Sequence, residues 1–229
     1  LFFSATMAPE IERITNTFLS SPVRVEVARQ ATASETIEQG VVLFKPNQRE
    51  SEGKEKREIL RILIDNEEDT CTNAIIFCNR KTDVNICAKS LVKHGYDAAP
   101  IHGDLDQSQR TATLDQFRRG KLRFLVASEV AARGLDIPSV SHVFNFDVPS
   151  NSEDYVHRIG RTGRAGRVGK AVMVSTPKDK KNLQAIEALI DKNIPRIDNP
   201  IPNNKTKKFR GSQPTKLENI SLKNNTDSI

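Results

Sequence analysis

The sequence predicts an α/β fold, built on a doubly wound parallel sheet with helices on both faces. Three observations predict it: short continuous apolar runs, stretches between them with helical spacing of apolar residues, and polar or glycine-containing segments directly after several runs. Continuous apolar strands separated by helices are typical of a parallel sheet that is covered on both faces. A content of 37% hydrophobic and 28% charged residues fits a soluble globular protein.

The expected elements alternate along the chain. A helix over residues 8–19 and a β-like run at 23–27 come first. Apolar residues at helical spacing predict helices around residues 59–63, 84–91 and 183–190, and a further helix begins near Gln107. The apolar runs that predict strands lie at residues 41–44, 74–78, 98–101, 124–127, 142–145 and 171–174.

A change in composition between residues 28 and 38 divides the chain. We expect residues 1–30 to be the C-terminal remnant of a preceding α/β domain with the start of a linker, residues 31–200 to form a second α/β domain, and residues 201–229 to be a basic disordered tail. The tail has six basic and two acidic residues from position 203 onward and few apolar ones, a composition typical of disorder. The net charge of +6 favours a polyanionic partner.

Cysteine usage and hydropathy exclude several classes of protein. The three cysteines contain no CxxC pair, so neither a disulfide framework nor a metal site is expected, and a reducing cytoplasm is the expected compartment. Cys78 lies inside an apolar run, which predicts a role in core packing. No apolar stretch approaches the length of a membrane span, so no membrane association is expected.

The strongest local signal is a basic segment at residues 157–167. Arginine recurs at every third position, glycines alternate with it, and no acidic residue occurs between Tyr155 and Lys178. A solvated basic face is one interpretation. Arginine in place of lysine favours planar bidentate recognition of phosphate, and glycine lets the backbone approach a ligand or partner closely. The pattern therefore predicts an arginine array that faces phosphate.

The segment HRIGRTGR at 157–164 resembles motif VI of the DEAD-box RNA helicases at every position. Four other segments are similar to motifs III, IV, QxxR and V of that family, in its order: Ser4-Ala5-Thr6, Phe77-Cys78-Asn79-Arg80, Gln107 with Arg110, and the segment from Ser128 to Asp136. The resemblance covers about residues 1–195, points to bacterial members, and implies the second, C-terminal RecA-like domain of such a helicase. Motif V of the family usually begins Thr-Asp, so Ser128-Glu129 implies retained but weaker coupling.

The resemblance also implies roles for individual residues. The catalytic arginine fingers on the γ-phosphate of ATP are Arg161 and Arg164, with RNA-backbone or structural contacts as the alternative. Nucleotide binding adds Gly134 and Asp136, the latter on the ribose, with a turn aspartate as the alternative. The RNA-backbone contacts are Arg80, Gly103, Arg110, Ser128 and Arg133, although Arg110 is also readable as a surface charge. Interdomain coupling falls to Ser4, Thr6, His157 and Arg158, with a helix-surface pair as the alternative for the last two.

The implied function is the C-terminal half of an ATP-dependent RNA helicase that grips RNA without sequence preference. ATP with Mg²⁺ is expected to be held mainly by the first RecA-like domain, which is the second expected partner. The nearest match to a Walker A loop, at Gly169-Lys170, lacks both the first glycine and the hydroxyl residue, and no Asp-Glu-Ala-Asp sequence occurs. We therefore expect the chain alone to be inactive. The alternative is a non-catalytic module that binds RNA, or protein partners through its basic tail.

Overall fold

The computed structural model describes residues 9–23, 25, 36–132, 137–164 and 166–201. Several of the sequence-based predictions lie outside these residues. They are the predicted coupling residues Ser4 and Thr6, the motif V residues Arg133, Gly134 and Asp136, and the tail from residue 202. Most of the β-like run at 23–27 also falls outside. The predicted domain boundaries therefore stay predictions.

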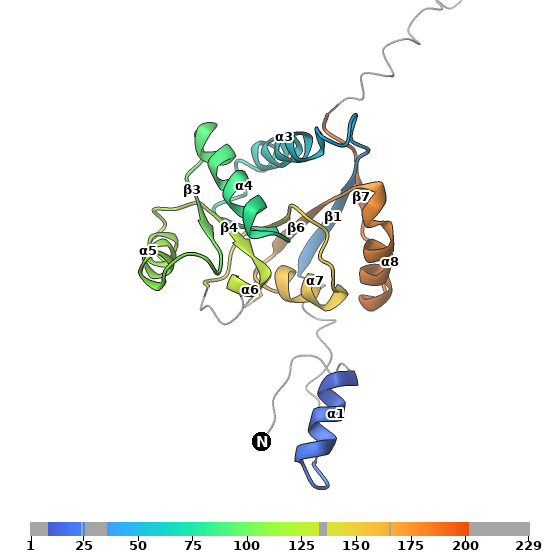
Figure 1. Ribbon diagram of the computed structural model, residues 1–229. Coiled ribbons are helices and arrows are strands. Elements are labelled where there is room, and N and C mark those ends of the chain that lie inside the picture. The colour runs from blue at the N-terminus through green and yellow to red at the C-terminus, as the bar shows by residue number, and fades with distance from the viewer. Residues whose placement is uncertain (1–8, 24, 26–35, 133–136, 165, 202–229) are drawn as a thin grey trace, which may run out of the picture.

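Within the described residues, seven parallel strands form one sheet in the order β3-β4-β2-β5-β6-β1-β7 (Figure 1). β1 pairs with β6 from Ile37 opposite Gly169 onward, and the other strand pairings among the described residues are also parallel. The strands are β1 (Ile37–Leu43), β2 (Ala74–Cys78), β3 (Ala98–Ile101), β4 (Phe124–Ser128), β5 (His142–Asn145), β6 (Gly169–Ser175) and β7 (Arg196–Ile197). The predicted fold class is confirmed.

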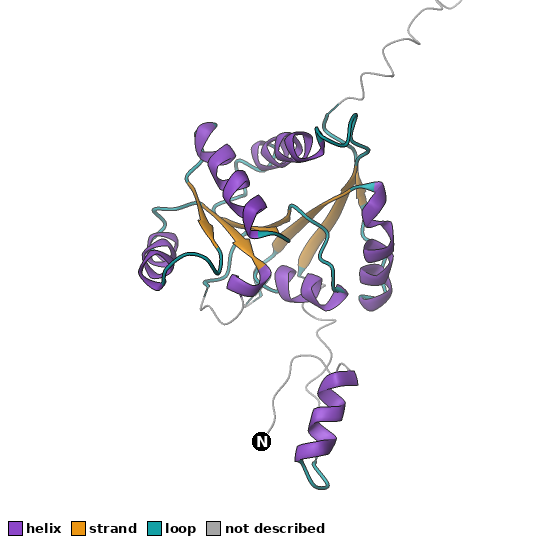
Figure 2. Cartoon of the chain, viewed as in Figure 1, coloured by secondary structure: helices purple, strands orange, loops and turns teal. Residues whose placement is uncertain are grey.

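Helices cover both faces of the sheet (Figure 2). Residues of α3 and α4 pack in the apolar core on one face, and residues of α5, α7 and α8 pack in the core on the other. The chain thus forms three layers with two separate cores. The helical elements are α1 (Pro9–Phe18), α3 (Glu52–Asp65), α4 (Lys81–Lys93), α5 (Gln107–Arg118), α6 (Glu129–Ala132), α7 (Ser152–Ile159), the 3-10 turn η1 (Pro177–Asp179) and α8 (Lys180–Leu189).

The strand β2 shows why the predicted strands are continuously apolar. All five of its residues are buried, and successive side chains point to opposite faces of a sheet. Ile75 and Phe77 belong to the core under α5 and α7, whereas Ile76 and Cys78 belong to the core under α3 and α4. The core position predicted for Cys78 is confirmed, and the three cysteines are buried free thiols.

The strand β7 was not anticipated, because its two residues lie among prolines. It packs on β1 where Gly40 leaves room: a Cβ atom at Gly40 would overlap the side chain of Ile197. No helix in the described residues is long and apolar enough to cross a bilayer.

The link between α7 and β6 is packed without spare volume at Gly169. A Cβ atom there would lie under 3.0 Å from the hydroxyl of Thr162 and the backbone nitrogen of Gly163. The same hydroxyl is within hydrogen-bond distance of the carbonyl oxygens of Val140 (2.5 Å) and Ser141 (2.9 Å), so Thr162 has little freedom to move away.

We therefore expect Gly169→Ala to lower the free energy of unfolding by about 1–3 kcal/mol, because added volume strains a well-packed region. Urea denaturation followed by circular dichroism measures it. Gly103→Ala is the matched control, since a Cβ atom there meets nothing within 4 Å. Equal stability of the two variants would contradict the packing argument.

Candidate functional site

Polar residues gather where the strands end at one edge of the sheet. Asn79 and Arg80 follow β2, Gly103 follows β3, Glu129 follows β4 and Asp147 follows β5. Because these four strands are neighbours and parallel, the residues that follow them lie along the same edge. In open parallel sheets, this carboxyl edge is where ligands bind.

Arg158 is a deeply buried charged side chain at this edge, with 2% of its surface exposed. Its Nε donates to the Glu129 carboxylate at 2.8 Å. One terminal nitrogen, NH1, donates to the carbonyl oxygen of Asp147 at 3.1 Å, and the other, NH2, donates to Oδ1 of Asn79 at 3.0 Å. The guanidinium also lies 5.1 Å from the centre of the Phe77 ring.

The contacts of Arg158 within the described residues are therefore inside the domain, joining the ends of β2, β4 and β5. The helix-surface alternative for this residue is wrong, because the side chain does not reach the surface. Coupling to another domain stays a prediction, and Arg158 would act in it through the side chains that it holds.

Glu129 replaces the aspartate that is usual in the family motif, and the structure shows what its longer side chain contacts. Its carboxylate is largely shielded, with 15% exposed, and pairs with Arg158 at 2.8 Å. The extra methylene thus does not leave the carboxylate without a cation. Motif V is joined to motif VI through this ion pair.

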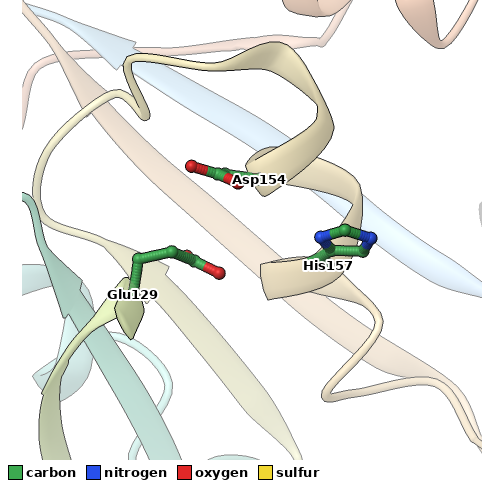
Figure 3. Close-up of side chains that lie close together, drawn as sticks. All are labelled: Glu129, Asp154 and His157. Carbon is green, nitrogen blue, oxygen red and sulfur yellow. The ribbon is translucent and has the colours of Figure 1, made fainter. Parts of the chain in front are cut away.

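Glu129, Asp154 and His157 lie close together (Figure 3). Glu129 extends from α6, whereas Asp154 and His157 are one helical turn apart on α7. Each offers a potential ligand atom for a metal ion within 4.8 Å of the other two. The carboxylate of Glu129 already pairs with Arg158, so a cation there would compete with a guanidinium. The expectation of no metal site stays a prediction.

Arg161 and Arg164 follow α7 on a turn that hydrogen bonds connect to Thr36 and Ala132. Gly163 adopts a positive φ of 67°, and its carbonyl oxygen accepts a hydrogen bond from the hydroxyl of Thr36 at 3.0 Å. Arg161 is partly buried, and its NH2 donates to the carbonyl oxygen of Ala132 at 3.4 Å. Arg164 is exposed, and its Nε donates to the carbonyl oxygen of Gly160 at 2.6 Å.

The two arginines interact electrostatically. Burial lowers the pKa of the Arg161 guanidinium from its ordinary value, and the positive charge of Arg164 lowers it further, while Glu129 opposes the shift. Two like charges held near each other on an ordered turn are stabilised when an anion binds. The pair therefore has the electrostatics of an anion site.

Three of the described candidates for RNA contact lie at or just beyond the ends of neighbouring strands, and the fourth, Arg110, lies on α5. Arg80 and Gly103 are exposed beyond β2 and β3, and Ser128 ends β4, paired with Cys78 of β2. Arg110 lies in the first turn of α5, where its NH1 donates to Oε1 of Gln107 at 3.3 Å. Its Nε is buried and has no hydrogen-bond partner among the described residues.

Two histidines near the ends of β3 and α4 have structural positions. His102 is 3% exposed, its Nε2 lies 3.0 Å from Oδ1 of Asn85, and its Nδ1 accepts from the backbone of Asp104 at 3.3 Å. His94 ends α4, and Gly95 follows with a positive φ of 88°.

Sequence reasoning missed Lys56 and Asp147. Lys56 is 3% exposed and forms an ion pair with Asp147. A weak signal was present, because Lys56 occupies the core-facing stripe of α3 with Ile59, Leu60 and Leu63. A lysine in such a stripe indicates either a buried partner or a side chain that reaches past the core to solvent.

Two hollows of about 430 and 450 Å³ lie along α8, and neither is lined by a predicted site residue. The second is bounded by the ends of β1 and β6, including Leu43 and Ser175. Arg161 and Arg164 thus lie outside both hollows.

A family model described as the helicase conserved C-terminal domain matches residues 55–166. The DEAD-box ATP-dependent RNA helicase CshA of Bacillus subtilis is 42% identical over 200 residues, which are 87% of this chain and 39% of the relative. The chain therefore spans about two fifths of the length of that curated relative.

Solved structures agree with the family match. Escherichia coli DEAD-box protein SrmB, bound to regulator of ribonuclease activity A, is 33% identical with a TM-score of 0.64, covering 70% of this chain and 90% of that chain. Saccharomyces cerevisiae Dbp5, bound to RNA and ADP BeF3, is 30% identical with a TM-score of 0.74, covering 86% of this chain and 51% of that chain.

Proposed function

Because this chain belongs to the DEAD-box ATP-dependent RNA helicase family, as its C-terminal RecA-like domain, we propose that it completes an ATPase site and grips RNA. The ATPase site forms when Arg161 and Arg164 meet ATP that is held, with Mg²⁺, by a first RecA-like domain. RNA is held along the ends of β2, β3 and β4. ATP hydrolysis coupled to RNA unwinding is then the activity of the two-domain protein.

The arginine pair carries the ATP part of this proposal. Arg161 and Arg164 lie on an ordered turn, and the positive charge of Arg164 helps to lower the pKa of the Arg161 guanidinium. A γ-phosphate placed between two domains would relieve this repulsion. Planar guanidinium groups bind phosphate oxygens in pairs and stabilise the charge that develops as the phosphoryl group is transferred. Like-charged arginines are not ligands for Mg²⁺, so the metal is assigned to the other domain.

The RNA part is supported by the alignment of three strand ends. Arg80, Gly103 and Ser128 follow or end neighbouring strands, and Arg110 has a buried donor without a partner among the described residues. Guanidinium, hydroxyl and backbone N–H groups suit phosphate and sugar, which carry no sequence information. Arg133 lies outside the described residues and belongs to this proposal by resemblance alone.

Arg110→Ala tests the RNA part. We expect the affinity of the chain for single-stranded RNA to fall about tenfold, the effect of one hydrogen bond to a charged group. The slope of log K against log salt should become shallower by about 0.7, because one phosphate contact is lost. Fluorescence anisotropy of a labelled oligouridine across a salt series measures both.

Arg118→Ala is the matched control for this test. Arg118 lies on the same helix, 3.5 Å from Asp115, and away from the first turn of α5. Its removal should leave affinity and slope near those of the unaltered chain. Equal losses in the two variants would show that α5 contributes only general positive charge.

A protein-binding module is the second candidate function. In the SrmB structure, a solved chain of which this chain covers 90% is bound to a protein partner. The two candidates differ in one observable: a protein-binding module need not bind RNA. Failure of the unaltered chain to bind oligouridine at low salt would favour this second candidate.

A further inference from the structure

Lys56 is a buried ammonium group at the carboxyl edge of the sheet, outside every motif that the family resemblance assigns. Its side chain is 4% exposed, pairs with the carboxylate of Asp147, and lies 4.7 Å from the centre of the Phe146 ring. A buried cation is stable only when an anion and further polar contacts accompany it. The ion pair therefore fixes Asp147 in one orientation.

Asp147 forms hydrogen bonds at this edge through its carboxylate and through its backbone. Its Oδ1 accepts from Lys56, and its Oδ2 accepts from the backbone N–H of Asn79 at 3.0 Å. Its carbonyl oxygen accepts from Arg158 at 3.1 Å, and its own N–H donates to the carbonyl oxygen of Phe77 at 3.3 Å. Asp147 thus ties the end of β2 to the end of β5.

Asn79 continues the connection. Its Nδ2 donates to the carbonyl oxygen of Val148 at 2.8 Å, and its Oδ1 accepts from Arg158 at 3.0 Å. Lys56, Asp147, Asn79, Arg158 and Glu129 form one continuous set of contacts, which we call the strand-end network. It runs from α3 on one face of the sheet to α6 and α7 on the other.

The charges in the strand-end network alternate and cancel. Lys56 and Arg158 are the cations, and Asp147 and Glu129 are the anions, with side-chain exposures between 2% and 18%. Removing one member leaves an opposite charge buried without its partner, which is more disruptive than removing a surface ion pair. A substitution at one member of the network should therefore affect the others.

Arg80, the residue after Asn79, is a candidate RNA contact directly adjacent in sequence to the strand-end network. Its surroundings also contain Asp83 in the first turn of α4. Burial raises the pKa of the Asp83 carboxyl, and so does Asp147, whereas Arg80, Lys56 and Arg57 lower it. The Asp83 carboxyl therefore interacts electrostatically with Arg80, with Lys56 and with Asp147, which Lys56 pairs with directly.

We propose that Lys56 and Asp147 are positioning residues for RNA binding at Arg80. Asp147 holds the Asn79 backbone in place at the end of β2. Lys56 neutralises Asp147, so that the Arg80 guanidinium binds phosphate instead of the nearby carboxylates. This inference rests on the proposed RNA function and extends it to residues from α3 and the segment after β5 that do not contact RNA themselves.

Asp147→Asn tests the geometry directly. Asp147 accepts two hydrogen bonds through two carboxylate oxygens, whereas an asparagine amide has only one oxygen, which Lys56 would occupy. The amide nitrogen would then face the N–H of Asn79, donor against donor. We expect the hydrogen-exchange protection of the Asn79 amide to fall about tenfold, while that of Val172 in β6 stays unchanged.

The double variant Lys56→Met with Asp147→Asn makes the test sharper. Without the ammonium group, the single amide oxygen is released to accept from Asn79, so protection should return to within about threefold of the unaltered chain. Affinity for labelled oligouridine should follow the same order: about tenfold weaker in Asp147→Asn and restored in the double variant.

Lys178→Met is the matched control. Lys178 also pairs with a carboxylate of α3, Glu52, but it is 64% exposed. This variant should leave exchange and affinity unchanged, because an exposed ion pair contributes little. Lys56→Met alone is a further test. It should weaken RNA binding, because the Asp147 carboxylate, no longer neutralised, would compete with phosphate for the Arg80 guanidinium.

The possible outcomes distinguish failure of this proposal from failure of the proposed RNA function. Unchanged Asn79 protection in Asp147→Asn would overturn the proposal. Reduced protection with undiminished RNA affinity would also overturn it, because Asn79 would then be held without consequence for RNA. If the unaltered chain does not bind oligouridine, the proposed function fails, and the exchange measurement still decides whether Lys56 and Asp147 hold the end of β2.

Discussion

Replacing Arg161 by alanine is expected to lower the turnover number for ATP by about 10²–10⁴ in a two-domain protein that joins this chain to a first RecA-like domain. The reason is the proposed contact between its guanidinium and the γ-phosphate, which strengthens as charge develops during transfer. The loss should be somewhat smaller than for a sole arginine finger, because Arg164 remains nearby. RNA-stimulated phosphate release at saturating ATP and RNA measures it, and the KM for RNA should change little.

Two further variants decide what the arginine does. Arg161→Lys should not restore turnover, since an ammonium group is a point charge and lacks the planar fork. Arg167→Ala is the control, because Arg167 is exposed, continues the spacing of arginines, and lies beyond the segment that matches the family motif. Full turnover in Arg161→Lys would replace the finger assignment with general electrostatic attraction at the interface.

Replacing Arg158 by alanine is expected to lower the free energy of unfolding of this chain by about 3–5 kcal/mol. The substitution removes the cation paired with the largely shielded carboxylate of Glu129, and it removes the donors to Oδ1 of Asn79 and to the carbonyl oxygen of Asp147. Urea denaturation followed by circular dichroism measures the change.

Arg164→Ala controls for the loss of an arginine from the same motif. Arg164 is exposed, and its Nε donates to the carbonyl oxygen of Gly160, so its replacement should change stability by less than about 0.5 kcal/mol. A loss below about 1 kcal/mol for Arg158→Ala would mean that the buried ion pair contributes little net stability, as some buried pairs do.

Local pattern was sufficient to predict most of the sheet. The run at 74–78 is apolar at every position because both faces of β2 are covered, and that property is visible without any knowledge of its partners. β7 was not predictable in the same way. Its two residues owe their strand conformation to pairing with β1, at a point where Gly40 admits Ile197.

The site residues were predictable only where the sequence resembles the family motifs. The segment that contains Arg158 reads as a uniformly basic surface, yet Arg158 is buried while Arg164 is exposed. The difference arises from partners far along the chain, Asn79 and Glu129, which no local pattern reveals. Lys56 was missed for the same reason, because its partner Asp147 follows a different strand.

The strand order has a consequence for how this domain emerges from the ribosome. Among the described strands, β1 is the first made, but both its neighbours, β6 and β7, are the last. Roughly 130 residues separate β1 from β6, so at a synthesis rate of about 5–20 residues per second β1 waits on the order of ten seconds for its partner. During that interval its apolar residues Val41 and Val42, fully buried in the finished domain, have no sheet to join. A nascent chain halted before residue 169 should therefore bind chaperones and be cleaved readily, whereas one extended past residue 201 should resist cleavage.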